Sequence, residues 1–213
     1  MTEHRRPAAS IRPGFAREDW NERYAQKELV WTAEPNRRFA AEVEGLERGR
    51  ALDLACGEGR NAVWLAERGW RVTGVDFSDV ALAKAAELAA SRGVDVDWIA
   101  ADVLDHEPEP RAFDLVAVLY LQLPRDALLH AVETAASAVA PGGTLLVLGH
   151  DATNLTHGHG GPKDASVLYT AADVVPALGD LVVERAEAVE RTVPLEAGEA
   201  VAIDAFVRAH RTG

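Results

Sequence analysis

The sequence is short of cysteine and of long apolar runs, and each absence excludes a class of protein. Cys56 is the one cysteine among 213 residues, so no intrachain disulfide can form and a reducing compartment is favoured. No apolar run approaches the roughly 18 residues that a transmembrane helix needs. Arg5 and Arg6 are not followed by an apolar segment, so we expect no signal peptide. We therefore expect a cytoplasmic protein with no membrane partner.

Positive charge is also scarce. The 22 Lys and Arg residues are outnumbered by 34 Asp and Glu residues, which gives a formal net charge of −12. Nucleic acids and anionic membranes are bound through cationic surfaces, so we expect neither as a partner. The hydrophobic fraction of 48% is that of a globular chain, and the length favours a single domain. Residues 1–15 show no periodicity and are predicted to be a disordered arm, which leaves 16–213 as the domain.

From residue 50 onward, short apolar runs alternate with helical patterns. This alternation predicts an α/β fold, with a doubly wound and mostly parallel sheet that is buried on both faces. The expected strands are 51–54, 71–75, 96–99, 113–119, 144–148, 181–193 and 200–208, and the expected helices are 18–28, 35–46, 60–68, 79–91, 125–139 and 170–178. Only a turn-rich gap separates the last two strands, which predicts that they pair antiparallel.

The most informative segment is the turn between the first expected strand and the helix after it. Gly57 and Gly59 lack side chains and so let a ligand approach the backbone, and Ala62 follows at the spacing of a dinucleotide fingerprint. Asp76 ends the next strand about 20 residues later, in the place of an acid that binds ribose hydroxyls. These features indicate an adenosine-type cofactor without choosing which one.

Two further aspartates bear on that choice. Asp53 lies in the first strand, where a carboxylate would face the pyrophosphate of a dinucleotide unfavourably but would suit a cofactor with sulfonium and ammonium groups. Its alternative role is to hydrogen-bond the glycine turn. Asp102 follows the third strand and is placed to accept a hydrogen bond from an adenine amino group, and its alternative role is to cap a turn.

Four segments in order, 52–59, 75–78, 101–103 and 113–116, resemble the motifs of class I S-adenosylmethionine-dependent methyltransferases. Segments 20–24 and 30–36 are similar to the lid of small-molecule members, such as the tellurite-resistance and thiopurine methyltransferase-like groups. The resemblance implies a seven-stranded Rossmann-like sheet with the last strand antiparallel, lid helices at 16–48, and S-adenosyl-L-methionine as cofactor. The cofactor-binding residues that it implies are Asp53, Ala55, Gly57, Gly59, Asp76, Phe77, Asp102, Val103, Tyr24 and Trp31.

The methyl acceptor is expected past the fourth and fifth strands, because ligands sit at the carboxyl ends of parallel strands. The fourth strand leads into Tyr120 and Gln122, and it lacks the Asn/Asp-Pro-Pro-Tyr sequence of enzymes that methylate nucleobase amino groups. The fifth leads into the loop 150–169, where His150 is the candidate base because histidine exchanges protons near neutral pH. The residues assigned to catalysis are His150, Asp151 and Tyr120, and those placed at the acceptor are Trp20, Gln122, His157, His159 and Tyr169.

The histidines of that loop admit two interpretations, a metal site together with Asp151 or a lid over the acceptor. His157 and His159 lie on a glycine-rich loop, which favours the lid, so no metal is predicted.

These residues together predict methyl transfer to a small molecule by in-line displacement, carried out by a monomer or a homodimer. The resemblance favours a thiol or other chalcogen acceptor, and oxygen and nitrogen acceptors stay open. Two alternatives remain. A nicotinamide-dependent dehydrogenase is disfavoured by Asp53 and by the lack of a Tyr-x-x-x-Lys pair, and a non-catalytic S-adenosylmethionine-binding regulatory module is disfavoured by the intact set of cofactor acids.

Overall fold

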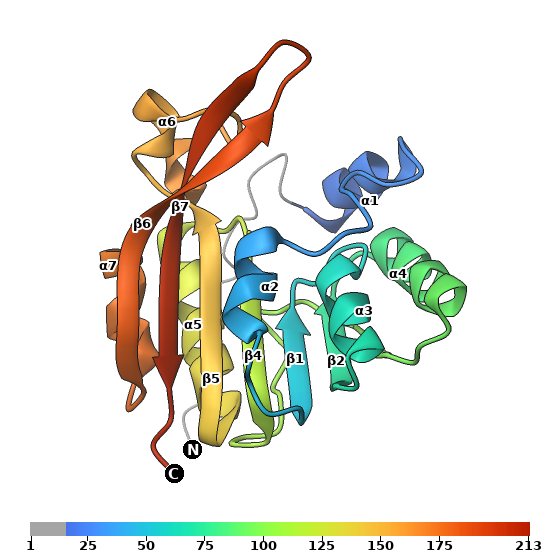
Figure 1. The fold of residues 1–213 in the computed structure, drawn as a ribbon, viewed down its shortest axis with the longest axis vertical. Coiled ribbons are helices and arrows are strands. Elements are labelled where there is room, and N and C mark those ends of the chain that lie inside the picture. The colour runs from blue at the N-terminus through green and yellow to red at the C-terminus, as the bar shows by residue number, and fades with distance from the viewer. Residues whose placement is uncertain (1–15) are drawn as a thin grey trace, which may run out of the picture.

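The computed structural model describes residues 16–213, and the predicted arm at 1–15 lies outside the described residues. Within them the chain forms one seven-stranded sheet with the order β3-β2-β1-β4-β5-β7-β6 and helices on both faces (Figure 1). Neighbouring strands are parallel from β3 to β5, and β7 runs antiparallel to both β5 and β6. The predicted fold class is therefore confirmed, including its antiparallel last strand.

The elements follow one another in the predicted alternation. The strands are β1 (Arg50–Leu54), β2 (Arg71–Asp76), β3 (Asp97–Ala100), β4 (Phe113–Leu119), β5 (Val139–His150), β6 (Val182–Pro194) and β7 (Glu199–His210). The helices are α1 (Arg17–Ala25), α2 (Arg37–Val43), α3 (Arg60–Glu67), α4 (Asp79–Arg92), α5 (Arg125–Ala138), α6 (Asn154–His157) and α7 (Ala171–Val174), with short 3₁₀ turns η1 (Ala165–Val167) and η2 (Val175–Leu178). Within residues 16–213, no helix is both long and apolar enough to cross a membrane.

Both faces of the central strands β1, β4 and β5 are buried, because successive residues of a strand point to opposite sides and both sides are covered there. Val116 and Leu145 lie in the core on the side of α5 and η2, whereas Leu115 and Leu146 lie in the core on the side of α2 and α3. This arrangement leaves the carboxyl ends of β1, β2, β4 and β5 free to present loops at one edge of the sheet.

Some boundaries differ from the sequence prediction, each for a local reason. Helix α2 starts later than expected because the Asn36 side chain accepts a hydrogen bond from the Phe39 N–H and so caps the helix. The expected helix 170–178 is divided into α7 and η2 at Pro176, which has no N–H to donate. Strand β5 starts earlier than expected because Val139 already pairs with Phe113.

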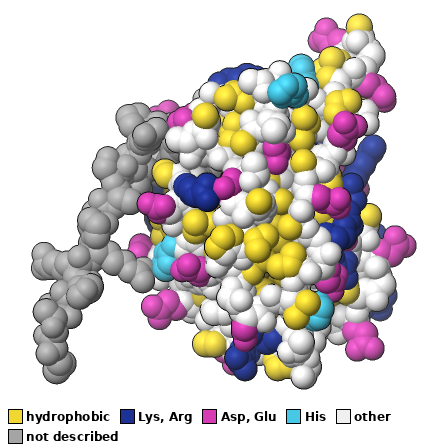
Figure 2. All heavy atoms as spheres, turned by 90° about the vertical axis from the view of Figure 1, so that its left-hand side faces the viewer, with side chains coloured by type: hydrophobic (Ala, Val, Ile, Leu, Met, Phe, Trp, Pro, Cys, Tyr) yellow, Lys and Arg dark blue, Asp and Glu magenta, His cyan; other side chains and the backbone are white. Residues whose placement is uncertain are grey.

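The tip of the β6–β7 hairpin projects beyond the rest of the sheet (Figure 1). The same end carries the loop 150–169, which contains α6 and η1 and is tied back by a bridge between Asp151 and Tyr169. Strand β6 is the outermost strand of the sheet, and Figure 2 turns its side toward the viewer, where acidic, basic and hydrophobic side chains are mixed.

Candidate active site

Two adjoining cavities lie between three parts of the chain. These are the glycine loop (residues 55–59, between β1 and α3), the lid (residues 16–48) and the ends of β4 to β6. The larger, of about 910 Å³, is lined by the loop between β1 and α3, by lid residues around α1 and α2, and by the end of β4. The smaller, of about 330 Å³, lies between the lid, the loop 150–169 and β6. Both cavities are lined by Trp31, Gln122, His150 and Arg191, so the two adjoin along these side chains.

The glycine loop has the conformation that the sequence predicted. Gly57 and Gly59 have φ angles of +55° and +75°, in the left-handed region that side chains disfavour. A Cβ on Gly59 would lie 2.6 Å from the Trp98 ring, and one on Gly57 would lie 2.9 Å from the Tyr24 hydroxyl. Gly57 also lines the larger cavity together with Ala55. The bare backbone at Gly57 is therefore available to a ligand.

Asp53 is the carboxylate in β1, and it is 1% exposed. Its Oδ2 atom has no hydrogen-bond partner among the described residues, although the carboxylate accepts a hydrogen bond from the backbone of Ala62. Burial and then the charge of Asp76 raise the pKa of Asp53 to about 7, and Arg60 opposes this shift. A buried oxygen without a donor is costly, and a cationic or donor group beside it would remove that cost. Asp53 therefore fits a cofactor with cationic groups.

Asp76 ends β2 and holds the glycine loop in place. Its carboxylate accepts hydrogen bonds from the N–H groups of Gly57, at 2.8 Å, and Ser78, at 2.9 Å. Burial raises the pKa of Asp76, and these backbone hydrogen bonds counteract part of the shift. The side chain does not line either cavity in this structure, so its role at the ribose stays a prediction.

The residues expected around the adenine are also outside both cavities. Asp102 accepts a hydrogen bond from the Leu104 N–H at 2.9 Å, which is the turn-capping role considered as its alternative. Val103 is 8% exposed and packs into the core on the α5 side, while Phe77 is half-buried. The assignment of Asp102, Val103 and Phe77 to the adenine therefore stays a prediction.

Two residues that the sequence does not single out, Glu58 and Lys84, hold the lid against the glycine loop. Glu58, 3% exposed, accepts hydrogen bonds from the N–H groups of Val30 and Trp31. The ammonium of Lys84, on α4, lies 3.2 Å from Glu58 and donates to the carbonyl oxygens of Tyr24 and Lys27. The signal for Glu58 was present, since it is a charged residue between two glycines of the loop. Nothing local in the sequence connects Lys84 to the lid.

Aromatic side chains of the lid face the cavities as predicted. Trp20, Tyr24 and Trp31 all line the larger cavity, and Trp31 lines the smaller one as well. The Arg23 guanidinium lies over both indole rings, 5.0 Å from the centroid of Trp20 and 5.4 Å from that of Trp31. Burial raises the pKa of the Tyr24 hydroxyl well above its ordinary value, as does the charge of Asp76, so this phenol stays neutral.

A buried carboxylate, Asp204 of β7, organises the acceptor side of the site. It is 1% exposed and accepts hydrogen bonds from the Tyr120 hydroxyl at 2.8 Å and from Arg191 Nε at 2.7 Å. Nδ1 of His150 lies 3.5 Å from Asp204 Oδ1, and the rings of His150 and Tyr120 are 5.0 Å apart. Burial alone would raise the pKa of Asp204, but the nearby His150 ring and the hydrogen bonds and charge of Arg191 outweigh it and lower that pKa. The cluster is therefore a histidine, a neutral phenol and an arginine around one ionised carboxylate.

The sequence predicts His150 and Tyr120 as site residues, but not Asp204 and Arg191. Both belong to strands in which no site residue is predicted, β6 for Arg191 and β7 for Asp204. They meet because the antiparallel register pairs Asp204 with Val189, two residues before Arg191. The sequence feature that indicates Asp204 as a site residue is its position as a carboxylate within an otherwise apolar stretch of β7.

Three predicted site residues lie elsewhere. Asp151 is 2% exposed and accepts hydrogen bonds from the N–H and the hydroxyl of Thr153, so it closes a turn and does not face the acceptor. Tyr169 is 4% exposed and packs in the core beneath Gly149, where an added Cβ would lie 2.2 Å from its hydroxyl. His157 is exposed and lines neither cavity.

Two other predicted residues reach the smaller cavity, namely Gln122 and His159. In the part of the chain that the structure describes, no group of three or more His, Cys, Asp and Glu side chains is arranged to hold a metal ion.

Residues 51–143 match a family model described as a methyltransferase domain. Over 106 residues the chain is 40% identical to a ubiquinone biosynthesis O-methyltransferase from Alkalilimnicola ehrlichii, a match that covers 48% of this chain and 42% of that protein. It is 28% identical over 146 residues to a 2-heptyl-1-hydroxyquinolin-4(1H)-one methyltransferase from Mycobacteroides abscessus, which covers 63% of this chain and 64% of that protein. The chain thus spans less than half the length of the O-methyltransferase.

Among solved structures, TehB from Haemophilus influenzae has the same fold, with a TM-score of 0.71 at 16% sequence identity over 92% of this chain and 67% of that one. At this identity the likeness concerns the fold alone.

Proposed function

We propose that the chain methylates the hydroxyl group of a small molecule with S-adenosyl-L-methionine as cofactor and His150 accepting the hydroxyl proton. The match of residues 51–143 to a methyltransferase-domain model supports this proposal. The observation that carries this proposal is the placement of His150 at both cavities, with its Nδ1 atom 3.5 Å from Oδ1 of the buried Asp204 carboxylate. A hydroxyl must lose its proton as it is methylated, and a histidine oriented by a carboxylate is suited to accept it.

In this proposal the cofactor is bound by residues of the β1–α3 turn and of the neighbouring strands. S-adenosyl-L-methionine supplies a methyl group on a sulfonium, which passes to the acceptor in an in-line displacement that leaves the bonding electron pair on sulfur. Asp53, whose Oδ2 lacks a partner within residues 16–213, would serve the cationic end of the cofactor. Gly57 would admit the cofactor to the backbone, and Asp76 would bind the ribose hydroxyls while it keeps the loop in shape.

On the acceptor side, His150, Asp204 and Tyr120 have different proposed roles. Nδ1 of His150 lies 3.5 Å from Asp204 Oδ1 and has no hydrogen-bond partner within residues 16–213, so a proton on Nδ1 would face the carboxylate and leave Nε2 as the atom that accepts a proton. The imidazolium that forms is stabilised by the same carboxylate. Tyr120 donates to Asp204, and burial raises the pKa of its hydroxyl far above the ordinary range, so it positions the cluster and does not act as a base.

The relatives favour oxygen as the acceptor atom. Those matched over the cofactor half include proteins named as O-methyltransferases, and the relative matched over 63% of this chain is named for a hydroxyquinolinone. The preference for a thiol or other chalcogen, expected from the resemblance, loses support here, because such acceptors are easily deprotonated and need little help from a base.

The test is an initial-rate assay of S-adenosylhomocysteine release with a panel of phenols, alcohols, thiols and amines. We expect phenols to be methylated, and His150→Gln to lower kcat by about 100- to 10,000-fold without changing the affinity for S-adenosylhomocysteine. His157→Gln is the matched control, since this histidine belongs to the same loop but lines neither cavity. An unchanged kcat for His150→Gln would contradict the base assignment. Tight cofactor binding without turnover of any acceptor would favour a regulatory module.

A further inference from the structure

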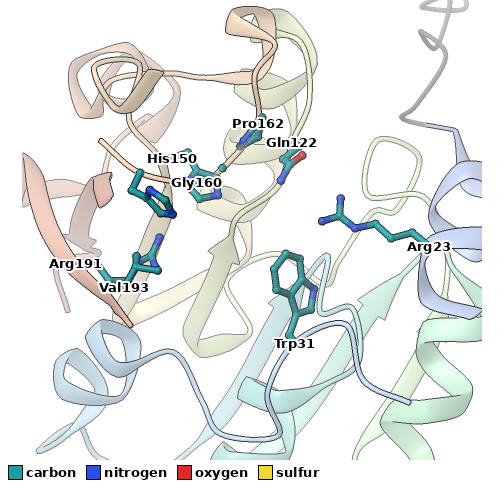
Figure 3. Close-up of a pocket in the computed structure, with 10 residues that line it drawn as sticks. Arg23, Trp31, Gln122, His150, Gly160, Pro162, Arg191 and Val193 are labelled. Carbon is teal, nitrogen blue, oxygen red and sulfur yellow. The ribbon is translucent and has the colours of Figure 1, made fainter. Parts of the chain in front are cut away.

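The smaller cavity is lined by cationic and titratable nitrogen groups in a chain whose net charge is −12. Arg23, Arg191, His150 and His159 line it, and no aspartate or glutamate is among its lining residues in the described part of the chain. Figure 3 shows Arg23 extending into this cavity toward Gln122. Basic side chains are therefore concentrated at this cavity, although the chain as a whole is acidic.

The two arginines differ in how their charge is balanced. Arg191 donates to Asp204 through Nε, at 2.7 Å, and through a second nitrogen at 3.3 Å, so this pair is close to neutral. Arg23 contacts the rings of Trp20 and Trp31 and forms no ion pair with any carboxylate of residues 16–213. Its guanidinium is thus a cation at the cavity that has no ion-pair partner among residues 16–213.

We propose that the methyl acceptor is an aromatic hydroxy acid whose carboxylate is bound by Arg23 while its hydroxyl faces His150. This inference rests on the function proposed above and adds the class of acceptor. A planar guanidinium matches a carboxylate with two parallel hydrogen bonds. The indole of Trp31 is 39% exposed and lines both cavities, which gives an aromatic ring a surface to pack against. The volume of about 330 Å³ suits one or two rings.

The carboxylate of the cofactor's own methionine group is the competing occupant of Arg23. The positions of the two cavities argue against it. Ala55, Gly57 and Glu58 of the glycine loop line the larger cavity, whereas Arg23 lines the smaller one and not the larger. The smaller cavity is also where His150 meets residues of the loop 150–169, on the acceptor side of the site.

The inference is tested first by binding, which needs no turnover. Calorimetry would measure the affinity of benzoate and of neutral benzamide for the protein saturated with S-adenosylhomocysteine. We expect benzoate to bind more tightly, Arg23→Gln to weaken it by about 10- to 100-fold, and Arg23→Lys to restore part of the loss. Arg17→Gln is the matched control, because Arg17 belongs to the same helix, is exposed, and lines neither cavity. Benzoate and benzamide binding with equal affinity would overturn the inference.

Turnover then separates this inference from the proposed function. Hydroxybenzoate isomers should show a higher kcat/KM than the matching hydroxybenzamides, and Arg23→Gln should remove that preference through KM. If phenols are methylated but acids are not preferred, the inference is overturned and the proposed function stands. If benzoate binds through Arg23 but no hydroxyl is methylated, the proposed function is the part that fails. A loss of affinity for S-adenosylhomocysteine in Arg23→Gln, with the acid preference intact, would assign Arg23 to the cofactor and overturn the inference.

Discussion

At the scale of single residues, Asp53 is the group whose environment departs furthest from what water would provide. Its carboxylate is buried in a strand, one oxygen has no partner among the described residues, and its pKa is raised to about 7. An acid whose pKa is higher in the folded than in the unfolded state binds more protons when folded between those two values. The stability that it contributes is therefore present at low pH and is lost as the pH rises toward and through 7.

Asp53→Asn removes this titration while nearly keeping the shape of the side chain. Its free energy of unfolding, relative to that of wild type, should rise by about 2–3 kcal/mol between pH 5 and pH 8, because only wild type must ionise a buried acid. Urea denaturation at several pH values measures this difference. The same substitution should weaken cofactor binding at pH 8. Parallel stability profiles for the two proteins would show that Asp53 titrates normally.

At the scale of elements, the lid depends on contacts made by its backbone more than on its own apolar surface. Helix α1 buries one residue, Tyr24, and apart from Trp20 and Ala25 its other residues are charged or polar. Its attachment comes from Glu58 and Lys84, which bind the N–H and carbonyl groups of residues 24–31, and from the Ser78 hydroxyl, which donates to Asn21 at 2.6 Å. Because Glu58 belongs to the glycine loop, any ligand that fixes this loop also fixes the lid.

Glu58→Gln should loosen the lid without unfolding the sheet. The amide of glutamine has one acceptor oxygen and no charge, so the N–H groups of Val30 and Trp31 and the ammonium of Lys84 lose charge-assisted hydrogen bonds. We expect hydrogen exchange at residues 30 and 31 to accelerate by about 10- to 100-fold. Glu67→Gln, which removes a surface ion pair with Arg92, is the control. Unchanged exchange in the lid would mean that other contacts hold it.

At the scale of the whole molecule, the sequence predicts the fold better than it predicts the site. Alternating apolar runs and helical patterns determine a parallel sheet, since few topologies bury such runs on both faces. The position of Asp204 beside His150 depends instead on the register of β5 and β7, in which these two residues pair, and no local pattern encodes it. Asp151 directly follows His150 in the sequence, but consecutive residues past a strand end point in different directions, and its carboxylate turns to Thr153.

The glycine loop and the lid are joined around one ligand site, so cofactor binding should stabilise the whole domain. S-adenosylhomocysteine at about 100 times its Kd should add about 2.7 kcal/mol and raise Tm by about 5–10 °C. NAD should produce no shift, because its pyrophosphate would meet the buried carboxylate of Asp53. Stabilisation by NAD alone would favour the dehydrogenase alternative and contradict the proposed function.

Two glycine variants show whether this stabilisation comes from the predicted site. Gly57 and Gly93 both have positive φ angles, of +55° and +66°, so alanine at either position costs about 1–2 kcal/mol through the backbone. Only at Gly57 would the added Cβ meet the Tyr24 hydroxyl beside the larger cavity, whereas at Gly93 it would meet nothing within 4 Å. Gly57→Ala should therefore lose the Tm increase caused by S-adenosylhomocysteine, and Gly93→Ala should keep it. Equal responses of the two variants would place the ligand away from the β1–α3 turn.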